Sequence, residues 1–424
     1  MKKQIINWTY TFILALGFVA ILSYSCTKTE TKDPLDGKAI EFGALLDLTV
    51  YNPENGLATK AALQFALEDL NNYAAIAGRN VTFTCSFADT KMDTTEAKTQ
   101  MENMYNKGIR MFVGGPYSST ELKAVMPFVK QNQCALINSS STAIGLNYAG
   151  SNVFRLCPDD NNQALALVSA AKTEGITAVI PIIRNDIWGT SLAEAFKTRF
   201  IEEGGFVYPG SIYSTSETSF ASLAGTIRSQ VNEAVATYGA DNVAVLALTY
   251  SEIEGIFTAA IQYEDLGLVK WYGCDGNACL ETLVSNSTLA AFAFKTGFMS
   301  SITSIGGAGQ PRDFEKSLSE KIESQTGVIP GVFSLSAYDA AYIMGQSCLE
   351  TGSTDMSKIT TIIPMVCNKY DQMGIRRWLN TNGDMKSGNY IFWKVLQSTD
   401  GYYWEQFATF WAGDTGDFIY RWPK

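Results

Sequence analysis

Short apolar segments alternate with longer amphipathic segments along most of the chain from residue 40 onward. Residues 40–46 predict a buried strand, and residues 57–73 predict a helix with one apolar face. The segment 81–87 alternates apolar and polar residues, which is typical of an edge strand. Further strands are expected at 109–113 and 135–137, with helices between them. Strands and helices that alternate at this spacing predict parallel βαβ units in a doubly wound sheet.

The same alternation starts again after residue 155, with strands expected at 178–183, 243–248 and 269–272. We therefore predict an α/β protein of two doubly wound parallel-sheet lobes, joined by a hinge of crossing strands. The chain is expected to cross between the lobes near residues 155, 300 and 372. The first lobe would comprise residues 38–155 and 300–372, and the second lobe residues 156–299 and 373–424.

The N-terminus has the pattern of an export signal. Lys2 and Lys3 precede an apolar run over residues 12–22, which is too short to span a membrane but suits the core of a signal peptide. The following Ser-Tyr-Ser-Cys26 resembles a bacterial lipobox, so residues 1–25 are predicted to be a signal peptide and Cys26 a lipidated residue. An uncleaved anchor is the alternative. Residues 26–37 are polar and charged and predict a flexible tether, so either reading places the body outside the cytoplasm.

Composition excludes several functions. The formal net charge of −10 argues against a nucleic-acid partner, whose binding needs a basic surface. The chain has no histidine, so a Ser-His-Asp triad, a Cys-His dyad or a histidine-ligated metal site cannot form. No phosphate-binding or dinucleotide-binding glycine motif is present. We therefore expect no enzyme, no cofactor and no metal. Among the cysteines, Cys274 with Cys279 and Cys348 with Cys367 are candidate disulfides.

Two clusters of small hydroxyl residues follow neighbouring predicted strands. Gly-Gly-Pro-Tyr-Ser-Ser-Thr occupies residues 114–120, and Ser-Ser-Ser-Thr occupies residues 139–142. Ligands of open parallel sheets bind outside the carboxyl ends of the strands, so these clusters are candidates for a binding surface. The alternative for Ser118 is a helix cap, because Ser118 and Glu121 have the spacing of a capping box. Four consecutive hydroxyl residues exceed what a turn requires, which favours a binding site.

Several short motifs, in this order and spacing, resemble the leucine/isoleucine/valine-binding proteins of ABC importers. The resemblance covers nearly the whole chain after the tether and implies the type I periplasmic-binding fold. Its motifs are Ala66-Leu-Glu-Asp-Leu-Asn71, Phe87-Ala-Asp89, the two hydroxyl clusters, Phe154-Arg155 with Pro158-Asp-Asp160, Asn185-Asp-Ile-Trp-Gly189, Ala337-Tyr-Asp-Ala340 and Asn382-Gly-Asp384.

The resemblance also implies a binding mode, in which a zwitterionic amino acid lies between the lobes. Ser118, Ser140 and Thr142 fall on the positions that hold its carboxylate. Asp275 falls on the acidic position that pairs with its ammonium group, although an aspartate before a glycine is also common in turns. The pocket aromatics would be Trp188, where the family usually has tyrosine, and Tyr250, with Tyr51 and Tyr117 as further candidates. Each aromatic residue could instead be part of the core.

The function implied is that of a lipid-anchored solute-binding protein, monomeric, facing the periplasm or the cell exterior. It would capture a branched-chain or similar amino acid and deliver it to the permease subunits of an ABC importer. A sensory or orphan receptor of the same fold, binding an amino-acid-like or amide ligand, is the alternative.

Overall fold

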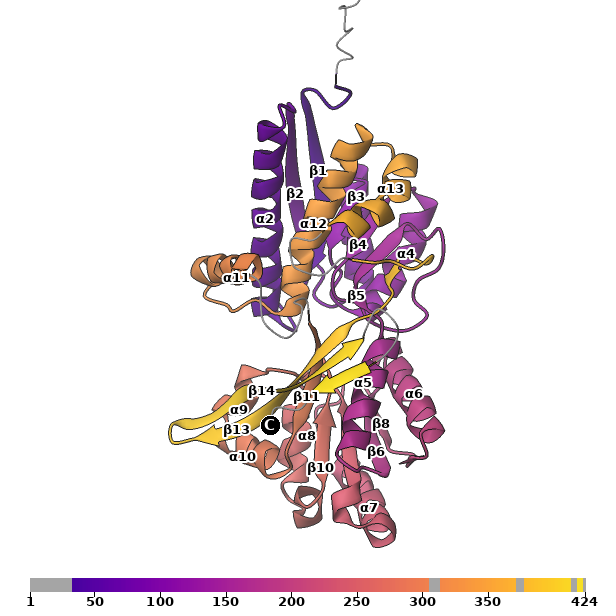
Figure 1. The fold of residues 1–424 in the computed structure, drawn as a ribbon, viewed down its shortest axis with the longest axis vertical. Coiled ribbons are helices and arrows are strands. Elements are labelled where there is room, and N and C mark those ends of the chain that lie inside the picture. Colours follow the sequence, from indigo (N-terminus) through magenta and orange to yellow (C-terminus); the bar gives the residue numbers. More distant parts are fainter. Residues whose placement is uncertain (1–32, 305–312, 371–376, 413–417, 422–424) are drawn as a thin grey trace, which may run out of the picture.

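The computed structural model describes residues 33–304, 313–370, 377–412 and 418–421, arranged in two α/β lobes (Figure 1). Each lobe contains one β-sheet with helices on its faces. The predicted signal peptide, Cys26 and most of the predicted tether lie outside the described residues. Residues 33–37 do not form part of a free tether, because Leu35 is fully buried and Asp33 forms an ion pair with Arg79.

The sheet of the first lobe has six strands in the order β12-β5-β4-β3-β1-β2, and all its pairings are parallel. β2 lies at the edge, as its alternating pattern predicted. The strands are β1 (Lys38–Leu46), β2 (Val81–Asp89), β3 (Met111–Gly114), β4 (Ala135–Asn138), β5 (Val153–Pro158) and β12 (Asp384–Met385).

Helices cover both faces of this sheet. Phe42, Ala44 and Leu46 of β1 pack with α2 and α12, whereas Leu45 packs with α3 and α4 on the opposite face. This split follows from the alternation of side chains along a strand. The helices are α2 (Pro53–Ile76), α3 (Thr94–Asn106), α4 (Ser119–Gln131), α11 (Asp313–Thr326), α12 (Val332–Thr351) and α13 (Met356–Lys369).

The sheet of the second lobe is larger and mixed. It has nine strands in the order β15-β14-β13-β11-β10-β9-β6-β7, with β8 paired to β6. The strands are β6 (Ala178–Arg184), β7 (Phe206–Val207), β8 (Ser211–Tyr213), β9 (Val243–Leu248), β10 (Lys270–Gly273), β11 (Met299–Ser304), β13 (Asn389–Ser398), β14 (Gly401–Ala412) and β15 (Phe418–Arg421). The pairings of β13, β14 and β15 are antiparallel, so this sheet departs from the purely parallel one predicted.

The helices of the second lobe are α5 (Asp160–Thr173), α6 (Ile187–Glu202), α7 (Ala221–Tyr238), α8 (Ile253–Ala260), α9 (Glu281–Ser285) and α10 (Ser287–Lys295), with short 3-10 helices η1 (Ala240–Asn242) and η2 (Glu264–Gly267). Within the described residues, no helix combines the length and apolar character needed to cross a membrane. The seven cysteines after residue 32 are free thiols, so neither candidate disulfide is formed.

The chain passes between the sheets after β5, after β11 and after β12. The third passage therefore lies between Met385 and Asn389 and differs from the one predicted near residue 372. Two buried ion pairs hold the preceding segment on the first lobe. Arg377 pairs with Asp339 of α12, and Asp384 pairs with Arg155 of β5, each at 2.6 Å.

Candidate ligand-binding site

The residues expected at the site all follow the carboxyl end of a strand. Tyr51 follows β1, and the two hydroxyl clusters follow β3 and β4. In the second lobe, Trp188, Tyr250 and Asp275 follow β6, β9 and β10. Doubly wound sheets place their ligand sites at these ends, because the connecting loops there are free to present side chains. The structure brings residues of both lobes into contact at this edge, as the contacts below show.

Ser118 caps helix α4. Its backbone is extended, its hydroxyl accepts a hydrogen bond from the N–H of Glu121 at 3.2 Å and donates one to the Glu121 carboxylate at 2.7 Å. The same carboxylate accepts the N–H of Ser118, which completes a capping box. The capping alternative is therefore confirmed. The single hydroxyl proton of Ser118 is used within the chain in this arrangement.

The second hydroxyl cluster is tied to the first by hydrogen bonds between the two loops. The hydroxyl of Ser140 donates to the carbonyl of Tyr117 at 3.0 Å, and the amide of Asn138 donates to the carbonyl of Pro116 at 2.7 Å. The carbonyl of Thr142 accepts the N–H of Asp160 at 2.9 Å, which joins this loop to the start of α5 in the second lobe. The two clusters thus form one surface next to the first passage between lobes.

Two buried carboxylates lie at the interlobe edge, of which only one was predicted. Asp275 has an unpartnered buried oxygen, Oδ1, and both carboxylate oxygens of the fully buried Asp160 lack a well-formed hydrogen bond within the described residues. The ion pairs described for the chain include neither residue. Asp160 was not predicted as a site residue, because an acidic residue in the first turn of a helix is ordinarily explained by its interaction with the helix dipole.

Burial dominates the electrostatics of this pair. It raises the pKa of Asp275 to about 6, and the nearby Gln163 amide opposes the rise. Burial also raises the pKa of Asp160 well above its usual range; the charge of Asp275 adds to that rise, and the charge of Arg155 opposes it without cancelling it. Ionisation of both of two close carboxylates in a dry site is energetically unfavourable unless a positive charge lies beside them. The arrangement therefore suits a cationic group.

Aromatic rings form the wall beside the acidic pair. The ring of Trp188 stacks on Tyr250 with centroids 4.5 Å apart, and Tyr51 of the first lobe lies 5.2 Å from Tyr250. The hydroxyl of Tyr51 accepts the N–H of Ser251 at 3.1 Å, so the wall also bridges the lobes. Trp188 is only 2% exposed and packs within the core, as the alternative for the aromatic residues allowed.

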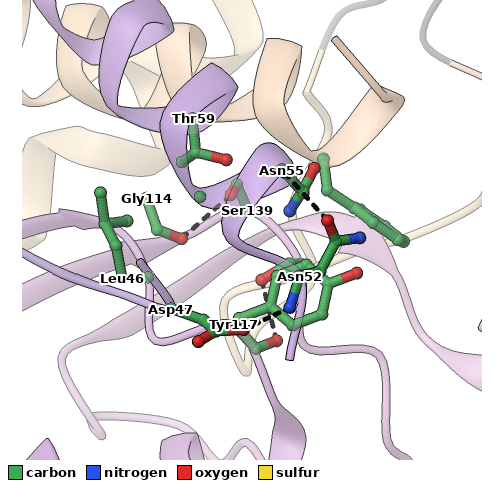
Figure 2. Close-up of a pocket in the computed structure, with 12 residues that line it drawn as sticks. Leu46, Asp47, Asn52, Asn55, Thr59, Gly114, Tyr117 and Ser139 are labelled. Carbon is green, nitrogen blue, oxygen red and sulfur yellow. Dashed lines mark hydrogen bonds between the residues drawn. The ribbon is translucent and has the colours of Figure 1, made fainter. Parts of the chain in front are cut away.

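A small pocket opens in the first lobe beside Tyr117 (Figure 2). Asn52, Asn55 and Thr59 line it from the start of α2, and Phe333 lines it from the start of α12. Sequence reasoning missed these four residues, because positions at or near the start of a helix suggest capping or packing. Tyr117 and Ser140 also line the pocket, so it is continuous with the surface of the hydroxyl clusters.

This fold and this interlobe site define a two-lobed ligand-binding protein. The chain belongs to the family described as the receptor family ligand binding region, whose model matches residues 58–390. The family is one of binding regions, and the chain is accordingly a binding protein and not an enzyme. An uncharacterized protein of Methanocaldococcus jannaschii is 25% identical over 420 residues, which are 94% of this chain and 96% of that protein.

Solved structures share the type I periplasmic-binding fold over most of the chain. The branched-chain amino acid transporter substrate binding protein LivJ from Streptococcus pneumoniae, in complex with isoleucine, has a TM-score of 0.67 at 15% identity. The match covers 91% of this chain and 100% of that one. A solute binding protein of an ABC transporter from Rhodopseudomonas palustris, in complex with 3,4-dihydroxybenzoic acid, has a TM-score of 0.69 at 15% identity, covering 88% and 97% of the two chains.

Proposed function

We propose that the protein is a lipid-anchored, extracytoplasmic solute-binding protein of an ABC importer that captures an amino acid between its lobes. One observation carries the choice of ligand class. The buried carboxylates of Asp160 and Asp275 lie together at the interlobe edge without an ion-pair partner among the described residues. The charge of Arg155, which pairs with Asp384, opposes the rise of the Asp160 pKa only in part. The ammonium group of an amino acid would supply a further positive charge, and a neutral ligand would leave the pair incompletely compensated.

The carboxylate of the same ligand would face the hydroxyl clusters of the first lobe. The hydroxyls of Ser118 and Ser140 already donate within the chain, so N–H groups at the start of α4 would be its first donors, assisted by the helix dipole. Ser118, Ser140 and Thr142 would hold the loops in position and contribute hydrogen bonds after small rotations. Trp188, Tyr250, Tyr51 and Tyr117 would enclose the ligand from the sides.

Delivery to a permease is the function we favour over sensing, because the solved proteins of similar fold named above serve transport. A thermal-shift screen of the chain without its first 32 residues, against the common amino acids and small amides, tests the ligand class. We expect at least one free amino acid to raise the unfolding midpoint, and calorimetry to confirm one site per monomer. If amides or uncharged solutes bind and amino acids do not, the ligand class is wrong.

Ligand affinity should depend on pH. The ammonium group needs an ionised partner, and the pKa of Asp275 is raised to about 6, so affinity should fall about 10-fold per pH unit below pH 6. Calorimetry between pH 5 and pH 8 measures this. An affinity that stays constant across the range would contradict the assignment of Asp275.

The stability of the unliganded protein should change with pH in the opposite direction to the ligand affinity. A carboxyl pKa near 6 in the folded state and about 4 in the unfolded state means that the folded protein binds more protons between these values. Its stability should therefore fall as pH rises from about 4 to 6, measured by urea unfolding without ligand.

The membrane anchor is tested at Cys26. Cys26→Ala should leave an uncleaved precursor or release the protein from membranes, because the thiol is the acceptor of the lipid. Cell fractionation and mass spectrometry of the N-terminal peptide measure both outcomes. Wild-type protein that is soluble and carries no acyl group would exclude the lipid anchor.

A further inference from the structure

We propose that the end of the first lobe formed by residues 33–38 and the last turn of α2 rests on the lipid surface that holds Cys26. Ile76 and Tyr73 would enter the layer of lipid headgroups there. This inference rests on the lipid anchor of the proposed function, and it adds the orientation in which the anchored protein meets its ligand.

The chain enters the first lobe at the end that lies farthest from the second lobe (Figure 1). Leu35 is fully buried and Asp33 forms an ion pair with Arg79, so the chain is fixed to the lobe from Asp33 onward. Only residues 27–32 separate this fixed point from Cys26. Seven residue steps span at most about 25 Å even in a fully extended chain, so a lipid on Cys26 keeps this end of the lobe within that distance of the lipid surface.

The last turn of α2 presents apolar side chains to solvent at this same end. Ile76 is 89% exposed, more than any other large apolar side chain among the described residues. Tyr73 lies one turn earlier on the same face of the helix and is 48% exposed. No charged residue occurs from position 70 to position 78. A tyrosine beside an isoleucine suits the interface of a bilayer, because the tyrosine has an apolar body and a polar tip.

The polar groups of this helix end are largely satisfied within the chain. The carbonyls of residues 73–75 accept the N–H groups of residues 77–79 at 2.8 to 3.0 Å, and Gly78 has the left-handed φ of +68° that this helix ending requires. The charges of Asp33 and Arg79 neutralise each other in their ion pair. Lipid headgroups can therefore cover the helix end without removing water from an unpaired charge, which would be unfavourable.

The short link to the lipid makes a small apolar contact sufficient. Two side chains bury too little apolar surface to hold a free protein on a bilayer. A linker of a few residues, however, raises the effective concentration of the helix end at the lipid surface to the order of millimolar, so a weak contact forms in most anchored molecules. The contact stays reversible, and the protein can leave it to meet a permease.

The contact also decides where the ligand site faces. α2 leads from the loop that carries Tyr51 to the end at Ile76, and its 24 residues correspond to about 36 Å. With Ile76 on the lipid surface, the interlobe site lies about one helix length along the molecule from that contact. The site is then directed toward the solution from which the ligand is captured.

Quenching by brominated lipid tests the contact on the acylated protein, reconstituted in vesicles of phosphatidylcholine and phosphatidylglycerol. Ile76→Trp adds a tryptophan at the helix end. The fluorescence that it adds should fall by roughly half when the phosphatidylcholine is brominated, because an interfacial side chain reaches the edge of the acyl layer. Ile329→Trp makes the same change at a side chain that is 75% exposed just before α12, at the opposite end of the lobe, and its added fluorescence should not change.

Hydrogen exchange of the anchored protein gives a second measurement. The N–H groups of residues 76–79 should exchange more slowly in the wild type than in Ile76→Asp, because the charged side chain is excluded from the lipid interface. Ile329→Asp is the matched control and should exchange as the wild type does. Both variants should fold, because both side chains are exposed, and Ile76→Asp should bind the ligand with unchanged affinity.

The outcomes separate this inference from the proposed function. Equal quenching of Ile76→Trp and Ile329→Trp, in protein whose acyl group is confirmed by mass spectrometry, would overturn the lipid contact and leave the anchor and the ligand class intact. Slow exchange of residues 76–79 only when permease subunits are present in the vesicles would overturn it in favour of a protein partner. An unacylated Cys26 would overturn the anchor and this inference together, whatever the ligand screen finds.

Discussion

Asp275→Ala should abolish measurable binding of an amino acid. The substitution would leave the ammonium group of the ligand buried beside a neutral methyl group, with only Asp160 to compensate it. Removing one partner of a buried charged pair costs about 3–5 kcal/mol, which corresponds to a loss of affinity of roughly 100- to 5,000-fold. Calorimetry of the wild type and the variant with the best ligand from the screen measures the loss.

The variant should fold normally, because Asp275 makes no ion pair whose loss would destabilise the protein within the described part of the chain. Removal of a carboxylate whose pKa is raised by burial should even stabilise the unliganded protein slightly at neutral pH. Asp241→Ala removes an exposed aspartate at the opposite end of β9 and is the matched control. Binding by Asp275→Ala as tight as wild type would exclude the proposed contact and favour an uncharged ligand.

Arg377→Ala should destabilise the first lobe by about 3–5 kcal/mol. The guanidinium of Arg377 donates to the Asp339 carboxylate at 2.6 and 3.0 Å and to the carbonyl of Leu156 at 3.0 Å. Both side chains are almost completely buried, and Tyr370 donates to the other Asp339 oxygen at 2.7 Å. Truncation would leave Asp339 charged in a dry environment, or force its protonation.

Urea unfolding measures this loss, and the unfolding midpoint should fall while its slope stays unchanged. Lys386→Ala removes an exposed basic residue further along the same segment and should change stability by less than about 0.5 kcal/mol. The double variant Arg377→Met/Asp339→Leu, which removes both charges, should recover much of the loss. Equal stability of Arg377→Ala and wild type would show that the pair does not hold this segment to the first lobe.

The local pattern of apolar and polar residues was sufficient to predict most of the helices and strands of the fold. The strand predicted at 243–248 matches β9, and the helix expected between the strands at 109–113 and 135–137 is α4, because a strongly periodic apolar pattern specifies both the element and its buried face. Residues 373–424 were expected in the second lobe, but the antiparallel hairpin of β13 and β14 was not predicted. Its pairing is a contact between segments, and such pairings are selected by packing on α5 and α10 that no local pattern records.

The sequence by itself determined the α/β class, the two-lobed plan and the strand ends at which the candidate site lies, since these depend on periodicity and on the geometry of parallel sheets. Only the tertiary structure decided which side chains meet there. It placed Asp160 beside Asp275, assigned the Ser118 hydroxyl to a helix cap, and collected Asn55 and Thr59 into a pocket beside Tyr117. The physical reason is that burial, pairing of charges and pocket size arise from contacts between residues distant in sequence, and a single chain read in order does not contain those distances.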